Sequence, residues 1–143
     1  MDLLRTLQIS ASGLSAERTR LQTISSNIAN AHTTRTDEGG PYLRKVPVFR
    51  AAPVPGANFG QMVDDKLAHP VVIDVIADQR APETVYDPGH PDADPVTGLV
   101  RMPNVNIVEE MVDMVDASRS YEANVSALSA ARNMALKALE IGR

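Results

Sequence analysis

The position of proline constrains the fold of this chain more than any other feature of its sequence. All ten prolines lie between Pro41 and Pro103, and segments 1–40 and 104–143 contain none. Because proline removes a backbone donor and disrupts a helix interior, long helices are expected only in the two proline-free segments. Residues 36–103 also hold six of the eight glycines, so this middle segment is predicted to be rich in turns.

The first proline-free segment has a heptad pattern. Its apolar positions alternate at spacings of three and four, which is typical of a helix that packs along one side. Gly13 lies inside the pattern, at a cost of about 1 kcal/mol relative to alanine. We predict a helix over about residues 3–31, with a stripe formed by Leu4, Leu7, Ala11, Leu14, Arg18, Leu21, Ser25 and Ile28.

The last segment repeats this rhythm. Asn104 or Asn106 can cap its start, and acidic residues follow where they suit the positive end of the helix dipole. Gly142 is a natural stop for the helix, which would be roughly 50–55 Å long at 1.5 Å per residue. Its stripe is formed by Ile107, Met111, Met114, Ser118, Tyr121, Val125, Leu128, Arg132, Ala135 and Leu139.

We expect these two helices to pair, because a helix gains most of its stability by packing an apolar face. The pairing could be antiparallel within one chain or between neighbouring chains. Segment 1–35 has four bases and two acids, and segment 104–143 has four bases and six acids, so opposite net charges favour pairing weakly. Small Ala and Ser residues beside the stripes would let the backbones approach closely.

The middle segment is expected to contain β-structure. Residues 42–49 alternate loosely and residues 71–77 are rich in β-branched side chains, which is typical of strands, whereas residues 86–95 are expected to form an extended, turn-rich loop. The expected fold class is therefore mainly α with a small β-containing insertion. Segments 1–35 and 104–143 would form a coiled-coil-like helical assembly domain, and residues 36–103 a small middle domain.

Composition argues against several classes of protein. The chain has no cysteine, which excludes a disulfide framework, a thiolate metal site and a cysteine nucleophile. Its net charge of −4 argues against a general nucleic-acid binder, and its aromatic fraction of 3% argues against a pocketed enzyme core. Residues 1–8 lack the basic region and apolar run of a signal peptide, and no apolar stretch is long enough to span a bilayer.

The strongest candidate for a metal site is an acidic loop containing one histidine. Its residues are Asp87, His90, Asp92 and Asp94, but their spacing does not fit an EF-hand, so we predict a solvated turn with aspartate caps. No nucleophile elbow, phosphate-binding loop or dinucleotide motif is present. The sequence therefore predicts no catalytic residue, no cofactor and no metal site.

Several polar residues lie on the predicted helices. Glu109, Glu110 and Asp113 are interpreted as a solvated charge cluster. For Asn27, Asn30 and Asn124 two interpretations remain open: they are surface or helix-end residues, or they make hydrogen bonds between subunits that fix helix register, as a buried Asn does in coiled coils.

Motifs spread over nearly the whole chain resemble the bacterial flagellar basal-body rod and hook family. Residues 12–14, 20–21, 24–25 and 27–30 are similar to the N-terminal signature of that family. The residues that resemble its proximal rod branch in particular are 39–45, 86–94, 98, 100, 102–106, 110–111, 119–124 and 141–142. The short middle segment also fits this branch better than the distal rod or hook branches, which carry larger insertions.

This resemblance implies a rod subunit in the periplasm, exported by the flagellar type III apparatus without a cleaved signal. Its terminal helices would pack in the inner tube, and its function would be to transmit torque from motor to hook around a central export channel. The implied partners are the rod proteins FlgB, FlgF and FlgG, FliE, the MS-ring, the export apparatus and further copies of the chain, with no nucleic acid and no small-molecule substrate.

Subunit contacts are expected along the two stripes, because growth of a tube requires one surface of a subunit to meet a different surface on the next. We also expect the isolated ends to be poorly ordered and to fold on assembly. The expected interface residues are Leu4, Leu7, Leu14, Leu21, Asn27, Ile28, Asn30, Ile107, Met111, Met114, Tyr121, Asn124, Val125, Leu128 and Leu139.

Two other classes remain as alternatives. A soluble helical adaptor or chaperone-like dimer could use the same heptads to bind a partner helix. A small hydrolase could use the acidic loop, with His90 as its essential residue.

Overall fold

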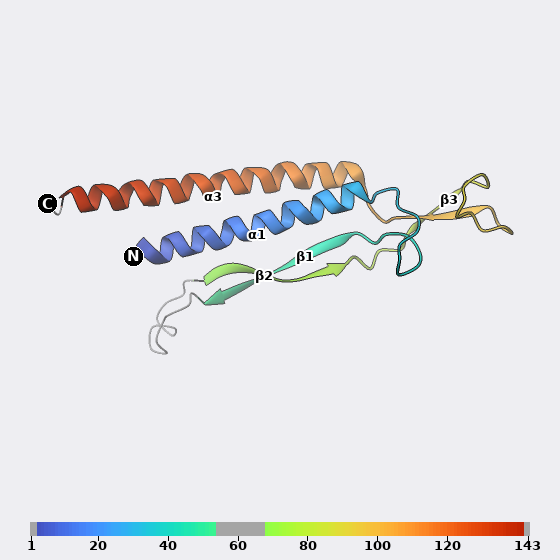
Figure 1. Ribbon diagram of the computed structural model, residues 1–143, viewed down its shortest axis with the longest axis horizontal. Coiled ribbons are helices and arrows are strands. Elements are labelled where there is room, and N and C mark those ends of the chain that lie inside the picture. Colours follow the sequence, from blue (N-terminus) through green and yellow to red (C-terminus); the bar gives the residue numbers. More distant parts are fainter. Residues whose placement is uncertain (1–2, 54–67, 142–143) are drawn as a thin grey trace.

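Two long antiparallel helices dominate the computed structural model, which describes residues 3–53 and 68–141 (Figure 1). Helix α1 spans Leu3–Ala29 and helix α3 spans Ile107–Ile141, so both proline-free segments are helical, as predicted. Helix α1 ends two residues before the predicted boundary, and the predicted stop at Gly142 lies outside the described residues. The helices pair antiparallel within one chain, which is the first of the two arrangements left open by the sequence; pairing between chains stays a prediction.

Helix α1 forms the middle of three layers. Helix α3 packs on one side of it, and strands β1 (Lys45–Pro53) and β2 (Ala68–Ala77) pack on the other (Figure 1). The two strands are antiparallel, with Lys45 opposite Ala77 and a bulge between Val48 and Phe49. The predicted β-containing insertion is therefore confirmed. Whether it behaves as a domain separate from the helices stays a prediction.

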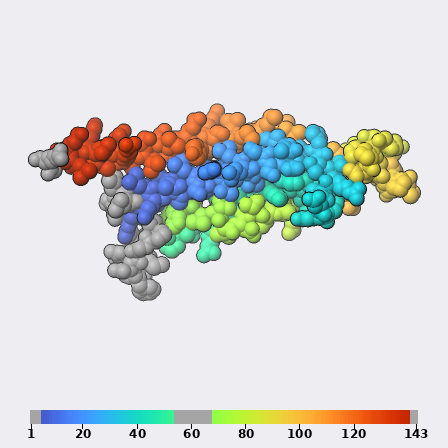
Figure 2. All heavy atoms as spheres, viewed as in Figure 1, coloured from blue at the N-terminus to red at the C-terminus, as the bar shows by residue number. Residues whose placement is uncertain are grey.

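A second hairpin projects beyond the helices, at the end where α1 finishes and α3 begins (Figures 1 and 2). Strands β3 (Glu83–Tyr86) and β4 (Leu99–Met102) pair antiparallel. The sequence indicated only a loop here, because these strands have four residues each. Gly98 has φ +66°, and a Cβ on it would lie 2.8 Å from Cε2 of Tyr86, so the returning turn requires glycine.

Asparagine side chains mark the helix boundaries at this end. Asn106 caps α3, since its Oδ1 accepts hydrogen bonds from the backbone N–H groups of Val108 (3.0 Å) and Glu109 (3.4 Å). Asn30 follows α1, and its Nδ2 donates to the carbonyl oxygen of Ser26 at 2.9 Å. Of the two cap candidates, Asn106 therefore has this role, and Asn104 has a different one described below.

The helices pair through faces that lie beside the predicted stripes, which corrects the expectation that the stripes themselves pair. On α1, the stripe positions Ala11, Arg18 and Ser25 are exposed. On α3, Met111 is 54% exposed. The buried positions are mostly small or polar; they are Ser10, Gly13, Ala16, Thr23, Ile24 and Asn27 on α1, and Glu110, Ala117 and Ala131 on α3.

Small residues permit this pairing because they let the two backbones come close. A Cβ built on Gly13 would lie 3.1 Å from Nδ2 and 3.3 Å from Cγ of Asn124, which is tighter than ordinary van der Waals contact. A periodicity analysis that weights large apolar residues misses such a face. The glycine therefore favours the close helix interface here, although it is a weak helix former.

Replacing Gly13 by leucine should therefore destabilise the protein, even though leucine is the better helix former. We expect Gly13→Leu to lower the free energy of unfolding by about 1–3 kcal/mol, because the side chain would overpack the contact with Asn124. Ala11→Leu on the exposed face of the same helix is the matched control, with a change within about 0.5 kcal/mol. Urea denaturation followed by circular dichroism measures both; equal stability of the two variants would contradict this packing.

Candidate functional site

The most deeply buried charged group of the described chain is the carboxylate of Glu110, one turn into α3. Its side chain is 0% exposed. Oε1 accepts a hydrogen bond from Nε of Arg44 at 2.5 Å, and Oε2 accepts one from Nδ2 of Asn27 at 3.0 Å. The solvated charge cluster inferred from the sequence is therefore wrong for Glu110, because a buried carboxylate is tolerated only when it is paired and hydrogen-bonded.

Asn27 joins this carboxylate to the first strand. Its Nδ2 also donates to the carbonyl oxygen of Lys45 (2.9 Å), while its Oδ1 accepts from the Lys45 N–H (2.9 Å) and the Tyr42 hydroxyl (2.9 Å). An amide side chain has two donor hydrogens and two acceptor positions, and all four are used here. Asn27 therefore binds the β1 backbone as a neighbouring strand would, and it holds α1 against β1.

Arg44 carries the positive charge of the site. Its guanidinium contacts Glu110, Asp113 at 3.2 Å and Asp78 at 3.6 Å. Burial alone would lower the pKa of Arg44, but the hydrogen bond and the charge of Glu110, with the charges of Asp113 and Asp78, raise it overall. Arg44 therefore stays cationic, and its planar fork can hold several carboxylates at once.

Asn104 binds the backbone of the segment before β1 and of the segment after β2. Its Oδ1 accepts from the backbone N–H of Arg44 at 2.7 Å, and its Nδ2 donates to the carbonyl oxygens of Asp78 (3.3 Å) and Arg80 (2.7 Å). The pKa of Asp78 is lowered because the backbone N–H and the guanidinium of Arg80 both donate to its carboxylate. We call Asn27, Tyr42, Arg44, Asn104 and Glu110 the buried cluster; it ties α1, β1, the segment after β2 and α3 together.

The three asparagines predicted at subunit contacts all have contacts within the chain. Asn27 belongs to the buried cluster, Asn30 binds the end of α1, and Asn124 packs on Gly13. The helix-end interpretation therefore describes Asn30, and a register-fixing role exists for Asn27 within one subunit. Contacts of these residues with other subunits stay a prediction.

The apolar residues predicted at subunit contacts fall into two groups. Met111, Tyr121, Val125 and Leu139 are exposed. The side chain of Leu4 is outside the described part of the chain. The half-buried members are Leu7, Leu14, Leu21, Ile28, Ile107, Met114 and Leu128.

In the acidic loop between β3 and β4, most polar side chains accept hydrogen bonds from backbone N–H groups and so cap turns. Oδ1 of Asp87 accepts from the N–H of Gly89 (3.2 Å), and Oδ1 of Asp94 accepts from that of Val96 (2.9 Å). The latter bond lowers the pKa of Asp94. Nδ1 of His90 accepts from the N–H of Asp92 at 3.1 Å. The predicted turn with aspartate caps is confirmed for Asp87 and Asp94.

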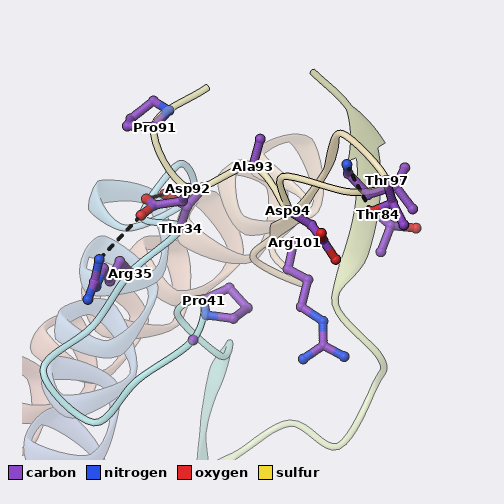
Figure 3. A pocket seen from close by; sticks show the side chains of 12 residues that line it. Thr34, Arg35, Pro41, Thr84, Pro91, Asp92, Ala93, Asp94, Thr97 and Arg101 are labelled. Carbon is purple, nitrogen blue, oxygen red and sulfur yellow. Dashed lines mark hydrogen bonds and ion pairs between the residues drawn. The ribbon is translucent and has the colours of Figure 1, made fainter. Parts of the chain in front are cut away.

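A hollow of about 650 Å³ lies between this loop, β4 and the segment after α1 (Figure 3). Asp92 bridges its walls, since its carboxylate accepts from the Thr34 hydroxyl at 2.7 Å and lies 3.8 Å from Arg35. Within residues 3–53 and 68–141, no group of three or more histidine and acidic side chains is arranged to hold a metal ion. The contacts of Asp92 therefore join the acidic loop to the segment after α1 across the hollow.

The sequence did not reveal the buried cluster, although one signal was present. Glu110, Ala117, Asn124 and Ala131 are spaced seven residues apart, and three of them are fully buried. A heptad of small and polar residues is easily overlooked beside a stripe of larger apolar ones.

In the described part of α1 and α3, neither helix is long and apolar enough to cross a membrane.

Comparison with known protein families gives a class for this pair of helices. Residues 7–35 match the model described as flagella basal body rod protein, and residues 96–141 match the C-terminal model of the flagellar basal body rod FlgEFG proteins. These two matches include most of α1 and all of α3. The fold and the matches define a structural protein of the flagellar basal-body rod.

Individual relatives extend this similarity to the full length. The flagellar basal-body rod protein FlgC of Escherichia coli O157:H7 is 42% identical over 143 residues, with 100% of both chains covered. The FlgC proteins of Borreliella burgdorferi (39% identical, 99% of this chain and 98% of the relative) and Bacillus subtilis (38% identical, 100% of both) are similar. The chain belongs to the FlgC family of flagellar basal-body rod proteins, and its role is that of a structural rod subunit.

Removing the carboxylate of Glu110 should strongly destabilise the chain. Glu110→Ala would leave the Arg44 charge and the Asn27 amide buried with a missing partner, so we expect a loss of about 3–5 kcal/mol in the free energy of unfolding. Glu109→Ala is the adjacent control: Glu109 is exposed and lies 3.7 Å from Arg80, and such a surface pair contributes at most about 1 kcal/mol. Denaturation of both purified variants measures the difference, and comparable small losses would show that the cluster contributes little.

Proposed function

We propose that this rod subunit polymerises through its terminal helices and transmits torque from the motor to the hook around a central export channel. The observation that carries this proposal is the exposed apolar surface of α3, which includes Met111, Val112, Val115, Met134 and Leu139. Exposed apolar side chains in such number on one helix are typical of a surface that other subunits cover.

Transmission of torque requires a subunit that does not deform easily. The buried cluster supports this requirement, because its hydrogen bonds and ion pairs join two helices, one strand and one loop at a single place. Small-residue packing between α1 and α3 supports it further, since close-packed interiors have low compressibility. The hairpin of β1 and β2 packs on α1 opposite α3, so in our proposal it faces outward from the tube.

We further propose a periplasmic location and export through the flagellar type III apparatus. The proposed partners are FlgB, FlgF, FlgG, FliE, the MS-ring, the export apparatus and other copies of this chain. Support comes from membership of a basal-body rod family, which implies assembly with other rod components. The expected contact residues are the exposed members of the α3 stripe and the half-buried leucines of α1.

Deleting the gene in the bacterium that carries it tests this function directly. We expect non-motile cells whose basal bodies, viewed by electron microscopy, lack an assembled rod and hook. A plasmid copy of the wild-type gene should restore both. Motile cells with an intact rod would refute the proposed function, and a stable cytoplasmic dimer with no association with basal bodies would favour the adaptor alternative.

A further inference from the structure

An apolar patch occupies the first two turns of α3 on the side that faces away from α1. It consists of Val108, Met111, Val112 and Val115, which are between 51% and 70% exposed. We call these residues the α3 outer patch. At spacings of three and four they share one side of the helix, whereas the fully buried Glu110 and Ala117 lie on the opposite side. Nothing in the described part of the chain covers the patch.

Further along α3 the same side becomes polar. The residues that continue the line of the patch are Arg119, Glu122, Ser126 and Asn133, all of them exposed. The change from apolar to polar within one helix side shows that the patch is a local feature. A helix side that only faced solvent would have no reason to concentrate four large apolar residues in two turns.

Helix α1 presents a different surface on its own outward side. Arg18, Gln22 and Ser25 are exposed there, and Leu14 and Leu21 beside them are half-buried. We call these five residues the α1 flank. The leucines belong to the stripe that the sequence revealed, and the pairing with α3 does not fully bury them.

The charges of the two surfaces are complementary. Asp116 and Glu122 lie next to the α3 outer patch, with Arg119 between them, whereas Arg18 is the single charge of the α1 flank. Among the ion pairs between residues 3–53 and 68–141, none includes Asp116, Glu122 or Arg18. The α3 outer patch thus has two acids and one base beside it, which gives a net negative charge. The α1 flank has one arginine, which gives a net positive charge.

From these observations we propose that the α3 outer patch of one copy docks on the α1 flank of a second copy of this chain. The proposal rests on the proposed function and specifies its contact surfaces. The α3 outer patch faces away from α1 of its own chain, because it lies opposite the buried Glu110 and Ala117, so one chain cannot bring the two surfaces together. A second copy that covers the patch still offers its own patch to a third, and such a heterologous contact builds a ring or an open assembly rather than a closed dimer.

This arrangement gives each helix two separate faces with different residue types. Small and polar residues pack within the subunit, where the backbones are close. Larger apolar residues remain outside, where they can fill the space between subunits. The offset between the predicted stripes and the observed buried faces follows from this division.

A charge placed in the patch tests the proposal. Val112→Asp should leave the circular dichroism spectrum and the unfolding midpoint of the purified chain unchanged, because the side chain is already exposed. In cells it should abolish rod assembly and swimming, since a charge buried at the centre of a contact weakens association by about tenfold or more. Ser126→Asp introduces the same charge on the same side of α3, outside the patch, and should preserve motility. Normal rods with Val112→Asp would overturn the proposal.

Disulfide crosslinking identifies the occupant of the patch. The chain has no cysteine, so engineered pairs have no background. Basal bodies from cells that carry Val112→Cys with Gln22→Cys, or Val112→Cys with Ser25→Cys, should yield oxidised species at multiples of 15.4 kDa. The single-cysteine variants should yield no such ladder.

The remaining outcomes separate this inference from the proposed function. A crosslink from Val112→Cys only to a protein of another mass would show that a different rod component covers the patch. Assembled rods without any crosslink for both pairs would also refute docking on the α1 flank. Either result leaves the structural role intact, because that role is refuted only by an intact rod in the deletion strain.

Discussion

The structure depends on one interaction, the buried contact of the Glu110 carboxylate with Arg44 and Asn27. Removing a carboxylate from water costs several kcal/mol, and only a complete set of partners offsets this cost. Asn27 lies on α1 and Arg44 directly precedes β1. Both partners therefore reach the carboxylate together only when α1, β1 and α3 have one relative position. The cluster therefore fixes the register of the helices, whereas apolar packing alone would permit neighbouring registers with a similar area of contact.

Packing of small residues extends this register along the helix pair. Gly13 and Asn124 meet about four turns from the cluster, and Ala117 and Ala131 are buried on the same side of α3. Such a seam buries little apolar area for its length, so larger side chains of both helices stay exposed or half-buried, and in our proposal other subunits cover them. A rod protein needs both properties: one subunit conformation that is specified internally, and enough uncovered apolar surface to hold its neighbours.

Much of the fold follows from local signals in the sequence. The absence of proline, the heptad pattern and the capping residues predicted both helices to within two residues at the described boundaries. Alternating and β-branched residues predicted strands in the regions of β1 and β2, but not their pairing. The buried cluster could not be predicted, because Asn27 and Glu110 are 83 residues apart and each is common on exposed helix surfaces. The sequence also predicted the wrong helix faces for the pairing of α1 with α3, for a related reason. A heptad of alanine, asparagine and glutamate carries no hydrophobic signal. This face of α3 is nevertheless the buried one, because the backbones of the two helices approach closely. The hairpin of β3 and β4 has strands too short to give a periodic pattern.

Hydrogen exchange in the purified subunit is the most direct measurement of the central claim. If the cluster holds the elements together, the amides of Arg44 and Lys45, which donate to Asn104 and Asn27, should be protected as strongly as those of α3 around Glu110. Protection should then decrease along α3 towards residue 141, away from the cluster. Rapid exchange of Arg44 and Lys45 beside fully protected helices would show that the helices pair without the cluster, and would contradict the account.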